Sequence, residues 1–112
     1  MKNQRTIKFR FWNKGFSRFY GLQEYPFDTK NYIVSQFTGL QDSKGKEIYE
    51  GDYISYGGNP IEVKYGEISI YENKFIGFYA NLVNDIPTLI NSDNSKTCKV
   101  IGNIFENPEL IK

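Results

Sequence analysis

Residues 37–52, with the sequence FTGLQDSKGKEIYEGD, decide the fold of this chain because they place a tight turn between two strand patterns. The side chain of Asp42 can accept hydrogen bonds from the backbone ahead of it, and Gly45 supplies the positive φ angle that closes a hairpin turn. Lys46 to Glu50 has the pattern of the return strand, and Gly51-Asp52 that of a corner from which another strand starts. This stretch therefore predicts a small β-rich module.

Strand patterns separated by turn residues extend from this stretch in both directions. Ile7 to Trp12 alternates with the period of a half-buried strand, and Phe16 to Tyr20 can return as its hairpin partner. The apolar alternation that begins at Ile61 slips by one position at Gly66-Glu67, which predicts a β-bulge or a glycine bend. Further strands are expected at residues 32–37, 53–56, 75–80 and 97–101.

The remaining segments predict little helix. Residues 21–30 and 82–95 show no regular pattern and are expected to form loops. No window of about a dozen residues has the 3.6-residue period of an amphipathic helix. Asn107-Pro108 is a helix-start signal close to the end of the sequence, so we expect one short terminal helical turn.

The bend predicted near residue 66 bears on the whole fold, because such bends let a short sheet curl into a barrel. We therefore expect a mainly β fold, with an N-terminal β-hairpin or extended region over residues 1–50 and a small curled barrel over residues 51–112. The alternative is that both parts form one continuous domain, which a chain of 112 residues also allows.

Two absences in the composition limit the chemistry of this chain. It has no histidine, the side chain that most readily exchanges protons near neutral pH. It has one cysteine, Cys98, so neither an internal disulfide nor a zinc site of cysteine and histidine ligands can form. We expect Cys98 to be a core residue, and we expect no catalytic residue, no cofactor and no bound metal.

The apolar residues are too dispersed for a membrane segment. No apolar run approaches the roughly 18 residues that cross a bilayer. Residues 1–5 include basic side chains, but the apolar segment of a signal peptide does not follow them. A single cysteine also suits a reducing compartment. We therefore expect a cytoplasmic protein without a membrane partner.

Three carboxylates, Glu47, Glu50 and Asp52, lie close together and raise the question of an acid–base or metal site. Strand alternation sends Glu47 to the face opposite Glu50, which separates the group. Carboxylates at turns commonly accept backbone hydrogen bonds, so we expect Glu50 and Asp52 to do so. Lys44 occupies a ligand position of any calcium loop that starts at Asp42, which excludes that motif.

The first twenty residues differ from the rest in charge, because they contain six Lys and Arg and no Asp or Glu. Cations interleaved with an aromatic ring are typical of proteins that bind single-stranded nucleic acid. The alternative is that this face packs on the acidic remainder of the chain or on a neighbouring subunit. The candidate contact residues are Lys8, Arg10, Trp12, Lys14 and Arg18.

Three segments together resemble one protein family. They are IKFRFW at residues 7–12, QFTGLQDSKGKEIYEGDYI at residues 36–54 and VIGNIFENPEL at residues 100–110. They resemble the YopX-like proteins of phages and prophages of Gram-positive bacteria, in the order in which that family has them. Tyr53 departs from the family pattern, which has an aliphatic residue there. The signature positions, which we expect to be structural, are Gly39, Asp42, Gly45, Tyr49, Glu50, Gly51, Asp52, Gly102, Asn103, Asn107 and Pro108.

The resemblance implies a small phage protein with an SH3-like barrel in its C-terminal part and a β-rich N-terminal part, and it implies no catalytic residues. Aromatic residues make up 17% of the chain, which favours an oligomer because exposed rings need a partner. We therefore expect a phage-encoded, non-enzymatic protein that self-associates, or binds a host or phage macromolecule, during infection. The alternative is a nucleic-acid-binding module that uses the basic N-terminal segment.

Overall fold

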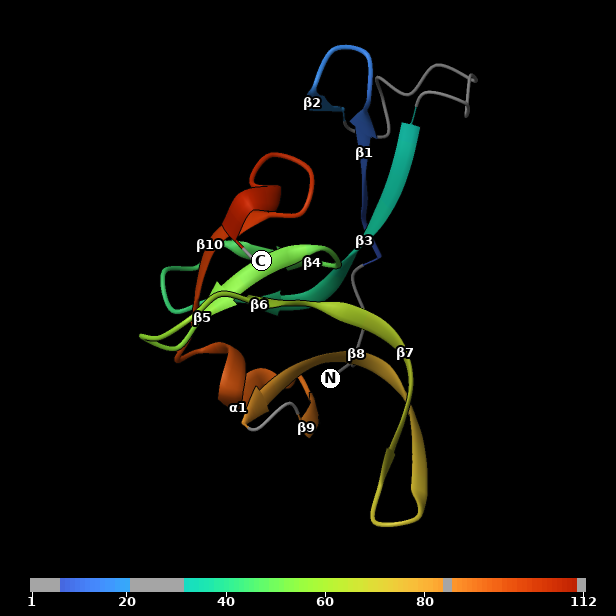
Figure 1. Ribbon diagram of the computed structural model, residues 1–112, viewed down its shortest axis with the longest axis vertical. Helices are drawn as coiled ribbons and strands as arrows, with labels where there is room; N and C mark the ends of the chain where they lie inside the picture. Colours follow the sequence, from blue (N-terminus) through green and yellow to red (C-terminus); the bar gives the residue numbers. More distant parts are fainter. Residues whose placement is uncertain (1–6, 21–31, 84–85, 111–112) are drawn as a thin grey trace, which may run out of the picture.

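A computed structural model describes residues 7–20, 32–83 and 86–110, and within them the regular structure is almost entirely antiparallel strand (Figure 1). The mainly β fold expected from the sequence is therefore confirmed. The strands are β1 (Phe9–Asn13), β2 (Arg18–Tyr20), β3 (Tyr32–Gln41), β4 (Glu47–Tyr49), β5 (Asp52–Ser55), β6 (Ile61–Glu62), β7 (Lys64–Ile70), β8 (Asn73–Val83), β9 (Ile86–Leu89) and β10 (Lys99–Asn103). The helical segments of the described residues are α1 (Ser92–Ser95) and the 3₁₀ helix η2 (Pro108–Leu110), and neither is long and apolar enough to cross a membrane.

Four strands form one antiparallel sheet in the order β2-β1-β3-β4. The expected hairpin of β1 and β2 is present, and Asn13 forms its turn. The Asn13 carbonyl accepts a hydrogen bond from the N–H of Ser17 at 2.8 Å, and its Oδ1 accepts one from the N–H of Phe16 at 2.7 Å. β3 continues to Gln41, beyond the expected end at Phe37. The loop expected at residues 21–30 lies outside the described residues.

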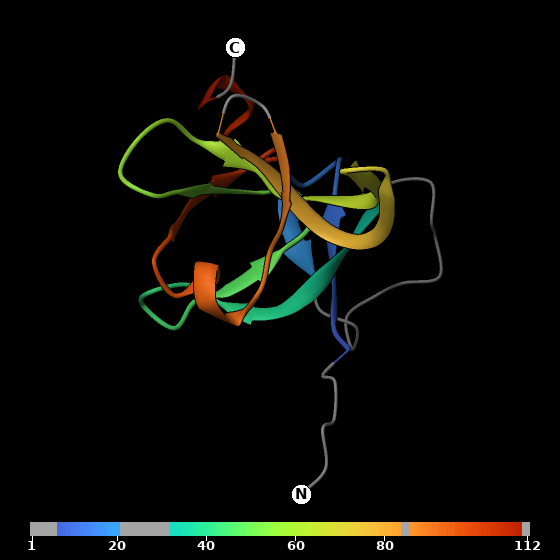
Figure 2. The ribbon, with the colours of Figure 1, turned by 90° about the horizontal axis from the view of Figure 1, so that it is seen from below.

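Two three-stranded sheets form the C-terminal part, in the orders β10-β5-β6 and β7-β8-β9. β6 leads into β7 through Val63, which is fully buried. The Val63 N–H donates to the carbonyl of Asp52, and the Val63 carbonyl accepts from the N–H of Gly51, both at 2.8 Å. The strands curl around a shared interior and form a half-barrel (Figure 2).

We expected a β-bulge or a glycine bend at Gly66-Glu67, and the β-bulge is wrong. β7 and β8 pair without a register shift from Lys64 opposite Tyr79 to Ile70 opposite Asn73. The chain instead changes direction at Val63, before β7 begins. Beyond that point β7 and β8 leave the half-barrel as a projecting hairpin (Figure 1), in which Ile68 is still buried at 5% exposed.

Residues 82–95, which we expected to form a loop, are partly regular. β8 runs to Val83, and β9 and α1 follow. Asn91 caps α1, because its Oδ1 accepts from the N–H groups of Asp93 and Asn94 at 2.9 and 2.8 Å. In turn, Oδ1 of Asn94 accepts a hydrogen bond from the N–H of Asn91 at 2.9 Å, which completes a capping box. The pattern was missed because such boxes usually have Glu or Gln in place of Asn94.

The main core takes side chains from both halves of the sequence. Ile48 on β4 is fully buried among residues of later strands, and Leu40 on β3 packs on the same cluster. Cys98 is a core residue as predicted, and its Sγ donates to the carbonyl of Ser95 at 3.2 Å. The division into residues 1–50 and 51–112 stays a prediction, and the shared core favours one continuous domain. The core residues are Ile48, Ile54, Val63, Ala80, Ile90 and Cys98.

Two asparagines hold the closing turn after β10. Oδ1 of Asn103 accepts from the N–H groups of Phe105 and Glu106 at 3.0 and 2.8 Å. Oδ1 of Asn107 accepts from the N–H of Asn103 at 3.2 Å. The expected helical turn at Pro108 is present, but the Asn107 side chain bonds back to β10 and does not cap it.

Replacing Gly102 with alanine is expected to destabilise the protein by about 1–3 kcal/mol, the usual cost of overpacking. The new Cβ would lie 2.6 Å from Oδ1 of Asn107 and 2.9 Å from Cδ1 of Leu110, so the closing turn must shift. Gly58→Ala is the matched control, because no atom lies within 4 Å of its Cβ. Urea denaturation of both variants measures the difference, and a Gly102→Ala variant as stable as the wild type would contradict it.

Candidate functional site

Arg10 lies at the junction between the N-terminal sheet and the half-barrel. Its Nη2 donates to Oδ1 of Asp52 at 2.7 Å, and its Nε donates to Oγ of Ser35 at 3.1 Å. The guanidinium carbon lies 4.3 Å from the ring centre of Phe19 and 4.6 Å from that of Tyr49. The Arg10 side chain is 16% exposed and that of Asp52 is 2% exposed, so this ion pair is internal.

Trp12 is also packed inward. It is 8% exposed, its ring meets the Phe19 ring edge to face at 4.9 Å between centroids, and it stacks on Phe105 at 5.6 Å. A ring covered on both sides cannot serve as a platform for nucleic-acid bases. Arg10 and Trp12 therefore follow the alternative left open by the sequence, in which this face packs within the chain.

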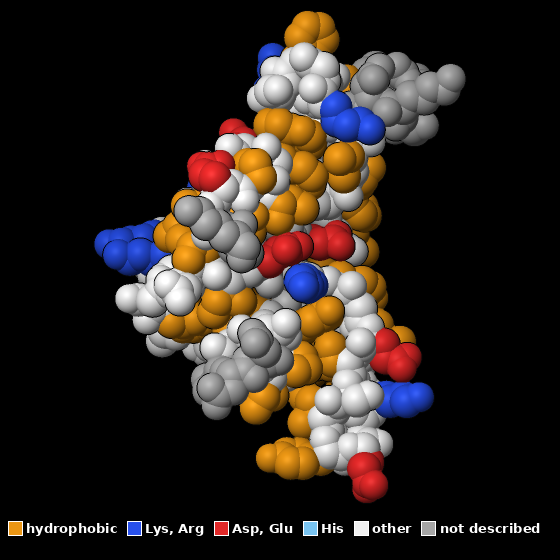
Figure 3. Space-filling model, in the orientation of Figure 1, with side chains coloured by type: hydrophobic (Ala, Val, Ile, Leu, Met, Phe, Trp, Pro, Cys, Tyr) orange, Lys and Arg blue, Asp and Glu red, His pale blue; other side chains and the backbone are white. Residues whose placement is uncertain are grey.

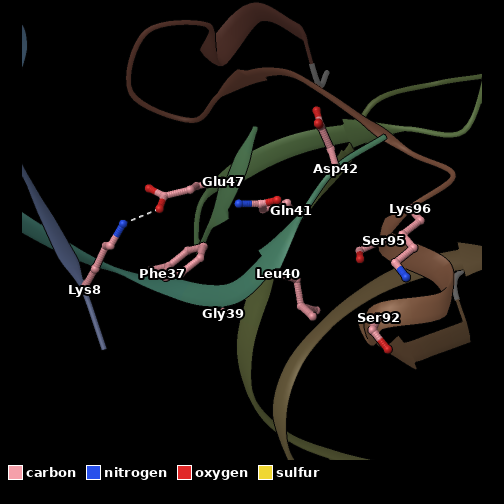
Figure 4. Close-up of a pocket in the computed structure, with 10 residues that line it drawn as sticks. All are labelled: Lys8, Phe37, Gly39, Leu40, Gln41, Asp42, Glu47, Ser92, Ser95 and Lys96. Atoms are coloured by element: carbon pink, nitrogen blue, oxygen red, sulfur yellow. Dashed lines mark hydrogen bonds and ion pairs between the residues drawn. The ribbon is translucent and has the colours of Figure 1, made fainter. Parts of the chain in front are cut away.

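The other three candidate contact residues have three different surroundings. Lys8 forms an ion pair with Glu47 across the sheet (Figure 4). Lys14 is exposed in the turn between β1 and β2. Arg18 lies over the ring of Tyr20 at 4.2 Å. The five candidates consequently do not form one exposed cationic face.

Asp52 is bonded to turn backbone, as predicted. Its Oδ2 accepts from the N–H of Tyr49 at 2.7 Å, while Oδ1 holds Arg10. Burial raises the pKa of Asp52, and the Arg10 guanidinium and the Tyr49 N–H act against that rise. For Glu50 the described contact is different from the one expected, since its backbone carbonyl accepts from Arg10 at 3.5 Å. Burial, together with the nearby Glu47 charge, raises the pKa of Tyr49 to about 12.

Asp42 organises the turn between β3 and β4 and ties it to β10. Its Oδ1 accepts from the N–H groups of Lys44 and Lys46 at 2.8 and 2.9 Å, and its Oδ2 accepts from the N–H of Val100 at 2.8 Å. Burial by itself would raise the pKa of Asp42, but these three donors outweigh it and hold the pKa below its usual value.

The family-signature positions gather in three structural places. Gly51, one of the glycines among them, has a φ angle of 89°, which other residues adopt only with strain. A Cβ atom added there would lie 3.4 Å from the side chain of Ile104. The positions are Gly39 near the end of β3 with Asp42 and Gly45 in the β3–β4 turn that follows, Tyr49, Glu50, Gly51 and Asp52 at the β4–β5 corner, and Gly102, Asn103, Asn107 and Pro108 at the closing turn.

A cleft with a volume of about 550 Å³ lies between β3 and α1, and Figure 4 shows the residues that line it. Its two charged groups at one end, Lys8 and Glu47, neutralise each other. Asp42 also borders the cleft, but its carboxylate is occupied by backbone donors. The described residues contain no group of three or more His, Cys, Asp or Glu side chains that could hold a metal ion. The cleft therefore offers apolar contacts, the polar side chains of Gln41 and Ser92, and the Lys96 side chain at its α1 side.

The sequence analysis missed an exposed apolar group on the hairpin of β7 and β8. Tyr71 at its tip is 93% exposed and Ile76 is 71% exposed. Tyr65 and Phe75 are half-exposed beside them. Figure 3 shows hydrophobic side chains along this projecting hairpin down to its end. The polar turn was expected at Tyr71 to Lys74, but only the structure shows how far the hairpin stands out from the core.

Comparisons with known proteins give a family and a fold. The family described as YopX protein matches residues 9–112. Among solved structures, the crystal structure of protein EF1440 from Enterococcus faecalis is similar, with a TM-score of 0.66 and 21% sequence identity. The similarity covers 97% of this chain and all of that chain. No curated protein matches.

Asp52→Asn is expected to lower the free energy of unfolding by about 3–5 kcal/mol, because it leaves the Arg10 cation buried without its counter-ion. The double variant Arg10→Met/Asp52→Asn should regain part of this loss. Glu67→Gln is the control, because it removes an exposed ion pair with Lys74 at 3.9 Å that contributes about 0–1 kcal/mol. Denaturant unfolding of all three variants tests this, and equal losses for Asp52→Asn and Glu67→Gln would refute it.

Asp42 is expected to make the fold sensitive to acid. Its folded-state pKa lies below the ordinary value of 3.8, so its stabilising contribution is complete above that value and is lost as the pH falls through the folded-state pKa. Asp42→Asn should lower stability at neutral pH and flatten its decline between about pH 5 and pH 2. Thermal unfolding across this range measures both effects, with the exposed Asp93→Asn as control. Parallel pH profiles for the wild type and Asp42→Asn would count against this role.

Proposed function

This chain belongs to the YopX family, and on that premise we propose that it acts by binding, through self-association or by capturing a protein partner during phage infection. In this proposal it is a phage-encoded protein of the bacterial cytoplasm and has no catalytic activity. The observation that carries the proposal is the apolar, projecting hairpin of β7 and β8.

The composition of the hairpin surface supports a contact with another protein. Tyr71 and Ile76 expose most of their side chains, and aromatic and aliphatic residues that meet water at a protruding site are typical of interaction surfaces. Tyrosine is among the residues that contribute most to protein interfaces. Two polar cross-strand neighbours, Lys74 and Glu67, pair with each other at 3.9 Å beside the apolar group. An apolar centre with polar residues around it is the usual composition of an interface.

The backbone at the hairpin tip adds a second argument. Tyr71 and Glu72 have φ angles of 50° and 70°. Two consecutive positive φ angles define a type I′ turn, for which Asn and Gly are the favoured residues. A tyrosine at the first position is strained, because a bulky residue is disfavoured at a positive φ angle and Asn or Gly would suit the turn better. Residues kept in strained conformations commonly have a functional reason, and here the strain presents a ring to the solvent.

An SH3-like barrel is the architecture that we propose for the C-terminal part. Its last strand, β10, pairs with its first, β5, and the strands that follow β5 are neighbours in chain order. A single helical turn, α1, precedes the last strand. This strand order is that of an SH3-like barrel and supports the assignment that the family resemblance implies.

The wild-type protein is expected to have an average molecular mass above the monomer value of 13.1 kDa in solution, because the hairpins of two copies bury each other's apolar side chains. The variant Tyr71→Asn/Ile76→Thr should be a monomer. Asn suits the positive φ at position 71 and Thr suits a strand, so this variant keeps the hairpin while it removes the apolar surface. Sedimentation equilibrium over a wide concentration range is the measurement.

Phe16→Asn is the matched control, because Phe16 is 75% exposed on the turn between β1 and β2, outside the hairpin. It should associate like the wild type. A wild type of 13.1 kDa at every concentration would exclude self-association and leave capture of a different protein. Equal association of the wild type and the hairpin variant would refute the hairpin as the contact.

A further inference from the structure

The turn between β3 and β4 is fastened to the start of β10, at a corner of the half-barrel away from the β7–β8 hairpin (Figure 1). The N–H of Ser43 donates to the carbonyl of Cys98 at 2.8 Å, and the N–H of Val100 donates to Asp42 at 2.8 Å. These bonds join segments that are more than fifty residues apart in the sequence. They join the backbone segment that carries Lys44 and Lys46 to the segment that carries Lys99, which lies between Cys98 and Val100.

Lys96, which ends α1 just before β10, completes a group of four exposed lysines that we call the lysine corner: Lys44, Lys46, Lys96 and Lys99. None of the four has an ion pair within the part of the chain that the structure describes. By contrast, Lys8, Arg10 and Lys74 are each paired with a carboxylate. Figure 3 shows Lys and Arg side chains standing out over the β3–β4 turn, at the left edge, without acidic side chains beside them.

The acidic residues of this region leave the corner positive. Asp42 is 6% exposed and its carboxylate accepts from three backbone N–H groups, so it forms no ion pair with the lysine ammonium groups, although the Lys46 charge still helps to lower its pKa. Glu47 is engaged by Lys8. Asp93 is the one acid between residues 91 and 99. Since the whole chain has a net charge of only +1, this local excess of cations is a property of the fold and not of the composition.

We propose that the lysine corner binds the phosphate backbone of a nucleic acid. Lysine ammonium groups are compact charges that bind phosphates without base-specific geometry, and their flexible stems suit a contact that follows a backbone. Lys44, Lys46 and Lys99 lie on segments that these hydrogen bonds join, and Lys96 follows α1 just before β10. The proposal therefore moves the cationic contact away from Arg10 and Trp12, which are buried, to a surface formed only by folding.

The test compares two charge-reversal variants with the same change in net charge. Lys44→Glu/Lys99→Glu alters the corner, and Lys14→Glu/Lys64→Glu alters two exposed lysines outside it. Each protein is titrated into a fluorescently labelled single-stranded oligonucleotide and into the corresponding duplex, and anisotropy is followed at low and moderate salt. Unchanged thermal unfolding midpoints establish that the variants are folded.

The wild type is expected to bind at low salt and to weaken as salt increases. The corner variant should bind about tenfold or more weakly, and its dependence of log K on log salt should be shallower by about 0.7 per lost phosphate contact on a single strand or about 0.9 on a duplex. The control variant should stay close to the wild type. The oligonucleotide bound more tightly identifies the strand type.

Two results would overturn the proposal. One is the absence of binding by the wild type to either oligonucleotide at low salt. The other is an equal loss for both variants, which would show an effect of net charge alone. Neither result bears on the hairpin, because the corner and the hairpin share no residue, and self-association is measured without nucleic acid.

Discussion

The ion pair between Arg10 and Asp52 joins two parts of the chain that contact each other only after folding. Asp52 begins β5, the first strand of the half-barrel, and its buried carboxylate also holds the corner after β4 through the N–H of Tyr49. Arg10 reaches it from β1, between the rings of Phe19 and Tyr49. Because an unpaired charge at this depth would be costly, the ion pair favours the arrangement in which the N-terminal sheet lies against the half-barrel. The packing of Trp12 on Phe105 follows from that arrangement.

A second carboxylate, Asp42, has a comparable role in the turn between β3 and β4, at the opposite end of β4 from Asp52. It accepts hydrogen bonds from its own turn and from β10, so that the first half of the chain is held to the last strand. The core between the two carboxylates contains Ile48 from the hairpin and Cys98 from the segment before β10. The signature stretch of residues 37–52 is thus a structural link, and its acidic residues stabilise the fold. What remains available for contacts lies further out, on the β7–β8 hairpin and the lysine corner.

Several elements were predictable because their causes are local. The turn at Asp42 to Gly45 and the helical turn at Pro108 depend on residues within a few positions, and both were expected. Other predictions failed where tertiary structure overrides the local pattern. The apolar phase slip near Gly66 predicted a β-bulge or a glycine bend, but β7 pairs with β8 in a regular register and the strand break falls at Val63, before β7 begins. The cationic stretch that includes Arg10 suggested a contact surface, but a partner 42 residues away draws its charge into the interior.

The sequence by itself determined the mainly β class, the position of the central turn, the family, and the absence of histidine chemistry. These properties depend on composition and on spacings of a few residues. Only the tertiary structure decided which charges are internal and which face the solvent, because that depends on segments far apart in the chain. Arg10 is drawn into the junction by its pairing with Asp52, whereas the segments that carry Lys44 and Lys99 are joined by the bonds between the turn and β10. The exposure of Tyr71 has the same origin, since a hairpin projects only relative to the body from which it leaves.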